Sequence, residues 1–269
     1  MRQISMQQML SFPGEIKECS GLASLPDGSL VALNDSGNPA ELYVFRMDKK
    51  DDFRSIEVTD AKNVDWEEMA EDSTYIYVGD FGNNHGDRKN LRIYRVRKDE
   101  LMTENAIKSK EIEFSFSGQS DFAKTERTNF DCEAMVCIGD SLYLFSKNHG
   151  NLKSNLYSLP KHPGKYEATH LGEIDAKGLI TGADYRKSGQ DEDLVLVGYT
   201  DRVHGHTPFV LFYKAFDRLD FAGSPVQRFR MEGQSQVESI LFYGPSEVLV
   251  ASEGKKKEDR NVYLLSLGN

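Results

Sequence analysis

One short sequence pattern recurs five times along the 269 residues of this chain. The copies begin at residues 18, 65, 131, 179 and 236, and they read ECSGLA, DWEEMA, DCEAMV, LITGAD and QVESIL. Each copy is followed by a polar turn, an apolar segment with a polar end, and another apolar segment. The starts lie 47, 66, 48 and 57 residues apart, so the repeating unit is near 50 residues. A fixed period of this size is typical of repeat architectures.

The units are built from short β-strand signals. Segments rich in β-branched and aromatic residues, bounded by Gly, Pro, Asn or Asp, recur throughout, as in LVALND (30–35), YIYVGD (75–80) and LVLVGY (194–199). Only residues 98–110, KDELMTENAIKSK, suit a helical turn. Units of three or four strands at this period predict an all-β fold, a five-bladed β-propeller. A β-sandwich, the other all-β candidate, does not account for the fivefold recurrence.

The two ends of the chain are predicted to close the ring. The last unit ends after three strands, and the N-terminal segment QISMQQML (3–10) can supply the missing outer strand. Residues 1–269 would then form one propeller domain without an open break in the ring. The 66-residue spacing is too short for two blades, and its excess fits a long polar loop at 117–129.

Composition restricts the partners. The formal net charge of -10 and the pI of about 5.2 argue against a nucleic-acid binder. No apolar run approaches the roughly 18 to 20 residues that span a bilayer. Three cysteines without a CxxC spacing indicate neither a disulfide framework nor a zinc site. The N-terminal segment has glutamines where a signal peptide would need an apolar stretch. The compartment therefore stays open: extracytoplasmic if a leader was removed, and cytoplasmic otherwise. We expect a monomer.

The repeat predicts a ring of carboxylates. In a propeller the first strand of each blade lines the central channel, and its beginning lies beside the end of the second strand. The first and third aligned positions of the copies are rich in acids, which are the candidate metal ligands: Glu18, Asp65, Glu67, Asp131, Glu133 and Glu238. The second strands end in residues that we assign to ligand binding or to catalysis: Asp35, Asp80, Lys147, Tyr199 and Glu253.

Six carboxylates around one axis would repel one another, so a cation or a set of basic side chains must offset their charge. An oxygen-rich site of flexible geometry favours Ca²⁺ over zinc or copper. Lys147, the one basic residue in the ring, is the alternative partner for a carboxylate pair. Two other interpretations are that the acids cap strand ends and accept backbone hydrogen bonds, or that they act directly in catalysis.

The loops after the second strands add histidines and basic residues on the same face. They read FGNNHGDRKN (81–90), KNHGNLKSN (147–155), TDRVHGHTP (200–208) and EGKKKEDR (253–260). Asn83 and Asp201 are candidate ligand-binding residues, and Arg88, Lys147, His149 and His204 are candidate catalytic residues. An acidic centre with a basic rim predicts binding of a small anionic or polyhydroxylated, sugar-like ligand.

Three classes of function remain open from the residues alone. The first is a binding protein that uses the ring and the rim. The second is a metal-assisted phosphate or carboxylate ester hydrolase, in which His149 or His204 moves the proton while Lys147 and Arg88 stabilise negative charge. The third is a protein–protein interaction platform.

Trp66 and Cys132 occupy the second aligned position, which alternates away from the acids, and they are predicted to pack between blades.

The segments NVDWEEMA, YIYVGDFGNN, LRIYRV, FDCEAMV, LYLFSKN and LITGADY resemble a widespread set of bacterial propeller proteins without assigned activity, whose members are often secreted or surface-attached. The openings SGLA and EAM are distantly similar to strand starts of phytase-like esterase propellers, and the blade count resembles that of calcium-activated nucleotidases. These resemblances imply calcium binding by Glu18, Glu67, Glu133 and Glu238, with Ser20 and Thr181. No arginine-rich phosphate signature extends beyond Arg88, Lys124 and Arg127, which argues against phosphohydrolase activity.

Overall fold

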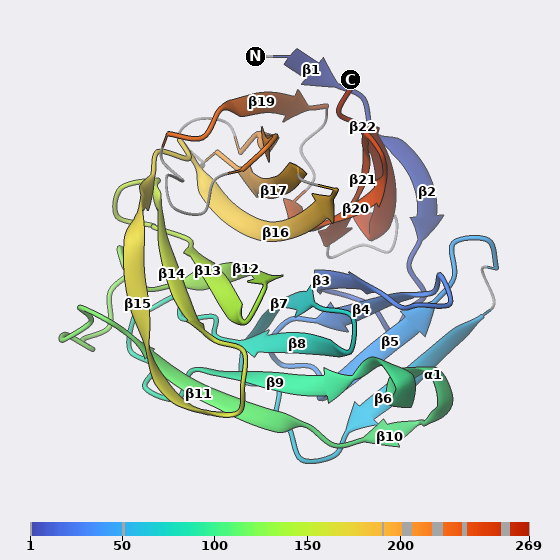
Figure 1. Cartoon of the computed structure of the whole chain (residues 1–269), viewed down its shortest axis with the longest axis horizontal. Helices are drawn as coiled ribbons and strands as arrows, with labels where there is room; N and C mark the ends of the chain where they lie inside the picture. Colours follow the sequence, from blue (N-terminus) through green and yellow to red (C-terminus); the bar gives the residue numbers. More distant parts are fainter. Residues whose placement is uncertain are drawn as a thin grey trace.

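The computed structural model describes residues 2–49, 52–189, 191–200, 206–216, 223–232, 236–253 and 259–268. Within these ranges the regular structure is β apart from one short helix, α1 (Lys98–Thr103), in the segment expected to hold a helical turn. Groups of strands surround a central axis (Figure 1), and the fold is the expected five-bladed β-propeller. No helix in the described part of the chain has the length and apolar character needed to cross a membrane.

Each blade is a set of strands that run antiparallel to their neighbours. Blade 1 contains β3 (Cys19–Ser24), β4 (Leu30–Asn34), β5 (Glu41–Phe45) and β6 (Phe53–Val58). Blade 2 contains β7 (Trp66–Glu71), β8 (Tyr75–Asp80), β9 (Arg92–Arg97) and β11 (Lys110–Phe116). Blade 3 contains β12 (Cys132–Ile138), β13 (Ser141–Ser146), β14 (Ser154–Pro160) and β15 (Gly164–Ile174). Blade 4 contains β16 (Leu179–Ser188), β17 (Asp191–Tyr199), β18 (Pro208–Tyr213) and β19 (Val226–Met231). Blade 5 contains β20 (Gln236–Gly244), β21 (Glu247–Glu253) and β22 (Asn261–Ser266).

The N-terminal segment closes the ring as predicted. Strand β2 (Gln7–Ser11) pairs antiparallel with β22 and becomes the outer strand of blade 5. Strand β1 (Arg2–Ile4) pairs in parallel with β19, the outer strand of blade 4. The first residues of the chain therefore tie the last two blades together (Figure 1).

Parallel pairs also join the outer strands of other blades. Strand β10 (Ala106–Ile107) lies against β6 of blade 1, and β11 of blade 2 pairs with β15 of blade 3. The long spacing between the second and third repeats is thus taken up by α1, β10 and the loop at 117–129, which holds no strand. These pairings protect strand edges that would otherwise be open to other chains.

Apolar side chains fill the junctions between blades. The described residues form five buried clusters, and each one joins residues of two neighbouring blades. Trp66 is fully buried between blades 1 and 2, where its ring lies 6.0 Å from that of Tyr94 in the cluster that also contains Leu33. Cys132 lies in the cluster between blades 2 and 3. The predicted packing role of Trp66 and Cys132 is confirmed.

The five inner strands, β3, β7, β12, β16 and β20, pack against one another around the axis, and β20 contacts β3 to complete the circle. Each inner strand has a register shift at the same aligned position, which marks a β-bulge. The extra residue is the third of each repeat: Ser20, Glu67, Glu133, Thr181 and Glu238. A bulge redirects side chains and bends its strand. The bulge shared by the five inner strands therefore sets the direction of Glu67, Glu133 and Glu238.

Candidate metal and ligand site at the channel mouth

Three carboxylates from blades 1 and 2 converge at the channel mouth. One oxygen each of Asp35, Asp65 and Glu67 can be chosen so that all three lie within 4.8 Å of one another. Oxygen ligands bind Ca²⁺ at about 2.3–2.6 Å, so oxygens around one such ion lie up to about 5 Å apart. Glu67 is buried, whereas Asp35 and Asp65 are partly exposed. One cation could therefore contact all three groups and still be open to a ligand.

A glycine makes room for this cluster. A Cβ atom on Gly82 would lie 2.2 Å from Oε1 of Glu67 and 2.5 Å from Oδ2 of Asp65. The backbone amide of Gly82 donates to the carbonyl of Asp65, so the loop after β8 lies directly against the carboxylates. Close approach of a backbone to a binding site is a common reason for glycine.

The charges of the cluster are costly without a cation. Burial, with the charge of Asp35 as the next contribution, raises the pKa of Asp65 to about 7. Burial and the charges of Glu133, Asp35 and Asp65 raise the pKa of Glu67 well above its usual range. Both shifts have the causes expected of carboxylates gathered in a partly desolvated site. A bound cation would oppose each of them.

Asp80 positions the Asp65 end of the cluster. Oδ1 of Asp80 accepts from the Asp65 amide at 3.0 Å and from Nη2 of Arg88 at 2.8 Å, and Asp80 is fully buried. Arg88 also donates to the carbonyl of Gly82 at 2.7 Å. Arg88, predicted to stabilise charge on a substrate, therefore holds the 81–90 loop in place.

Asp131 joins this loop to a histidine. Its Oδ1 accepts from the amide of Asn83 at 2.7 Å, and its Oδ2 lies 2.8 Å from Nε2 of His149. Asp131 is fully buried, and the His149 side chain is 22% exposed. Asn83 also donates to the carbonyl of Phe130. Asn83 and Asp131 thus connect the 81–90 loop to His149.

The basic residue of the ring is paired as well. Nζ of Lys147 lies 2.9 Å from Glu133, and both side chains are almost fully buried. Burial alone would lower the pKa of Lys147, but Glu133 and neighbouring groups raise it, so the lysine keeps its charge. Nζ is 5.6 Å from the centre of the Tyr199 ring, and that ring stacks on His206 with centroids 4.3 Å apart. The alternative in which Lys147 holds a carboxylate is the arrangement observed.

The remaining predicted residues take different positions. Glu18 is exposed and accepts from Asn38 at 2.9 Å, whereas Glu238 is buried. Glu253 is partly buried, and burial with the charge of Glu238 raises its pKa to about 8. The hydroxyl of Thr181 donates to the carbonyl of Val237. Asp201 and His204 lie outside the described residues.

Glu68 has a role that the repeat alignment did not reveal. It is fully buried on β7, and its Oε2 accepts from the amide of Ala183 on β16 at 2.9 Å. Blades 2 and 4 are not neighbours in the ring, so this bond crosses the channel. The signal was present in the fourth aligned position, where the other copies have small residues: Gly21, Ala134, Gly182 and Ser239. One large side chain at that level fills the space the small ones leave.

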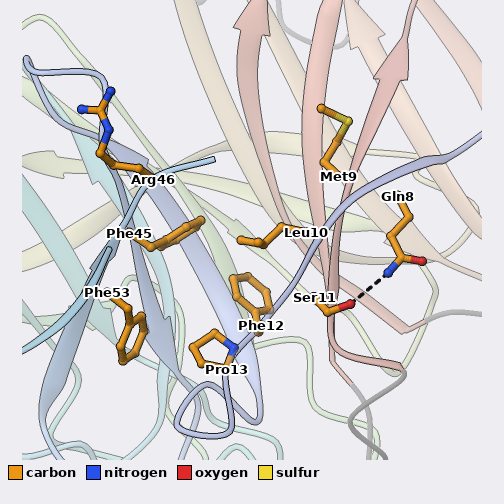
Figure 2. Close-up of a pocket in the computed structure, with 9 residues that line it drawn as sticks. All are labelled: Gln8, Met9, Leu10, Ser11, Phe12, Pro13, Phe45, Arg46 and Phe53. Atoms are coloured by element: carbon orange, nitrogen blue, oxygen red, sulfur yellow. Dashed lines mark hydrogen bonds between the residues drawn. The ribbon is translucent and has the colours of Figure 1, made fainter. Parts of the chain in front are cut away.

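A groove lies at the outer rim, between β2 of blade 5 and blade 1 (Figure 2). It has a volume of about 450 Å³ and is lined mainly by residues 8–13 with Phe45 and Phe53. Its charged residue, Arg46, is paired with Asp48 and donates to the carbonyl of Asp27.

The fold is that of a β-propeller, and carboxylates from two blades lie close together at the mouth of its channel. No family model matches the sequence, and no curated protein matches it.

Solved structures of similar fold include an α-L-arabinanase and α-L-arabinofuranosidases. The catalytic domain of a GH62 α-L-arabinofuranosidase from Coprinopsis cinerea has a TM-score of 0.59 and 11% identity, over 98% of this chain and 96% of that one. A GH93 α-L-arabinofuranosidase from Fusarium graminearum, solved with arabinobiose, has a TM-score of 0.55 and 8% identity, over 97% and 96%. An α-L-arabinanase from Penicillium chrysogenum, also with arabinobiose, has a TM-score of 0.53 and 11% identity, over 93% and 80%. At these identities the likeness shows the fold alone. These comparisons do not support a similarity to phytase-like esterases or nucleotidases.

Proposed function

We propose that the channel mouth binds Ca²⁺ and, through it, a small polyhydroxylated ligand. The observation that carries the proposal is the convergence of Asp35, Asp65 and Glu67, with oxygens within 4.8 Å, against a glycine that leaves space for them. Carboxylates from two blades with raised pKa values are held together by the fold, and a cation is the simplest way to offset their charge.

The coordination chemistry of Ca²⁺ suggests how the ligand would bind. Ca²⁺ takes 6 to 8 oxygen ligands, so three carboxylates leave positions for water and for neutral oxygens. Adjacent hydroxyl groups of a sugar supply such oxygens. Two of the proteins of similar fold are solved with arabinobiose, which supports a sugar-like ligand. An anionic ligand would have to bind through the metal, because Arg88, Lys147 and His149 already have carboxylate partners.

Glu67→Gln is expected to weaken Ca²⁺ binding by about 10-fold or more, since it removes the buried charge of the cluster. Arabinobiose should bind the Ca²⁺-loaded protein and should lose affinity in the same variant and after chelation. Isothermal titration of chelator-treated protein, first with Ca²⁺ and then with the sugar, measures both effects.

Two further variants sharpen this experiment. Glu57→Gln changes an exposed acid on β6, far from the inner strands, and should bind Ca²⁺ like the unmodified protein. Gly82→Ala adds a methyl group against Asp65 and Glu67, and it should weaken Ca²⁺ binding with little loss of stability because only side-chain ends must move. Equal Ca²⁺ affinity in all four proteins would contradict the proposed site.

The Asp131–His149 pair favours a second candidate, metal-assisted hydrolysis of phosphate or carboxylate esters. A buried carboxylate that binds one nitrogen of an imidazole orients the ring, so the other nitrogen can take or give a proton. The Ca²⁺-loaded protein would then turn over p-nitrophenyl phosphate or p-nitrophenyl acetate, and His149→Ala would lower the rate by about 100-fold or more. No turnover above the buffer rate, with Ca²⁺ bound, would exclude these ester classes.

A further inference from the structure

Glu238 is a buried carboxylate without a hydrogen-bond partner among the described residues. It is 5% exposed, and neither of its side-chain oxygens makes a hydrogen bond to that part of the chain. Gln236 and Thr181 lie near enough to lower its pKa, but neither reaches it with normal hydrogen-bond geometry. Buried polar groups in folded proteins are nearly always bonded, and buried charges are paired. An unpaired pair of oxygens at a binding mouth therefore indicates a ligand that donates to them.

The surroundings of Glu238 are negative. Its charge interacts with those of Asp35, Glu253 and Glu133. Lys147 is close enough to favour its ionised form, yet Lys147 forms its ion pair with Glu133 at 2.9 Å. The other basic groups described near the mouth, Arg88 and His149, contact Asp80 and Asp131.

The excess of negative charge at the mouth persists when the proposed cation is bound. Ca²⁺ offsets two of the three charges of Asp35, Asp65 and Glu67, and the Lys147–Glu133 pair is neutral. Glu238 and Glu253 then remain as carboxylates without a cationic partner among the described residues. A neutral sugar would leave both carboxyl groups without a cationic partner when they ionise, and an anionic group would be repelled by their ionised forms. An ammonium group brings a positive charge and three N–H donors to the same place.

We propose that the ligand of this mouth is a polyhydroxylated amine, such as an amino sugar or an aminocyclitol, and that Glu238 and Glu253 bind its ammonium group. The assignment rests on the proposed function, because it places the hydroxyl groups of the same ligand at the Ca²⁺ site. A cationic ligand differs from the anionic or neutral ligand that the basic residues of the loops led us to expect from the sequence. Glu238 supplies the buried contact, and the partly exposed Glu253 supplies the contact nearer the solvent.

Three sugars that differ at one substituent test the proposal with the intact protein. Glucosamine, N-acetylglucosamine and glucose are titrated into Ca²⁺-loaded protein at about neutral pH. Glucosamine is expected to bind at least about 10-fold more tightly than the other two, because a hydrogen-bonded charge pair in a buried site discriminates by that factor or more. Glu238→Gln should abolish the preference and keep Ca²⁺ binding, while Glu57→Gln should keep both.

The possible outcomes separate this proposal from the preceding one. Equal affinity for the three sugars would overturn the amine assignment and leave sugar binding intact. Binding of Ca²⁺ but of neither these three sugars nor arabinobiose would overturn both ligand proposals and leave the metal site. If Glu238→Gln does not fold, Glu253→Gln provides the same comparison, and the preference of the unmodified protein is measured without any variant.

Discussion

Deletion of residues 1–12 is expected to lower the unfolding temperature by more than about 10 °C. The deletion removes both N-terminal strands and three buried apolar side chains, those of Ile4, Leu10 and Phe12. Each such side chain contributes about 1.5–3 kcal/mol, so the loss is about 5 kcal/mol or more, out of a total near 5–15 kcal/mol. It also exposes the edges of β22 and β19. Thermal unfolding followed by circular dichroism measures the effect.

A shorter deletion provides the matched control. Removal of residues 1–5 takes away β1 and the buried side chain of Ile4, but it leaves β2 on blade 5. The loss should then be about 1.5–3 kcal/mol. A synthetic peptide of residues 1–14, added to the longer deletion, should restore part of the lost stability. If the two deletions melt within a degree of each other, closure by β2 is not what stabilises the ring.

The metal-free protein is expected to become less stable as the pH rises from about 5 to about 8. Burial raises the pKa of Glu238 to about 7 and, with the charge of Glu238, that of Glu253 to about 8. Both exceed the values of the unfolded chain, so the folded state binds more protons in this window. The stability from these groups is complete below pH 4 and is lost as the pH rises through 7 to 8. For Glu238 alone the change is about 3 kcal/mol at most.

Ca²⁺ should reverse this loss. Chemical unfolding of chelator-treated protein at several pH values, with and without Ca²⁺, measures it, and the stabilisation by Ca²⁺ should be larger at pH 8 than at pH 5.5. At 100 times the dissociation constant the gain is about 2.7 kcal/mol. Glu238→Gln should flatten the pH dependence, and Glu57→Gln should not. A metal-free protein that grows more stable towards pH 8 would contradict the pKa directions on which this prediction depends.

Local pattern predicted the architecture because a propeller repeats one local structure. The five aligned strand starts, the missing outer strand of the last unit and the loop at 117–129 are all properties of short segments. Their periodicity is visible without knowledge of any contact. The closure by residues 3–10 was predictable for the same reason, since an incomplete blade at one end requires a strand from the other.

The role of each acid was decided only by the tertiary structure. Asp65 and Glu67 join Asp35 from another blade, Asp131 binds His149, and Glu18 is exposed at the rim. The repeat places Glu18, Asp65 and Asp131 in the same aligned position, so it cannot distinguish them. The difference arises from the partners that the fold supplies. Lys147 forms an ion pair with Glu133, whereas Arg88 forms one with Asp80 and, among the described residues, none with Glu67.

The sequence by itself therefore determined the ring, its blade number and the ring of acids at its mouth. Tertiary structure decided which acids are paired, which converge on one point and which, like Glu238, have no hydrogen-bond partner in the described part of the chain. The physical reason is that alternation and turn signals act along one strand, whereas the pKa and the partners of a carboxylate depend on burial and on charges from other blades. Glu68 shows this most clearly, because its bond to Ala183 exists only when five blades close around the channel.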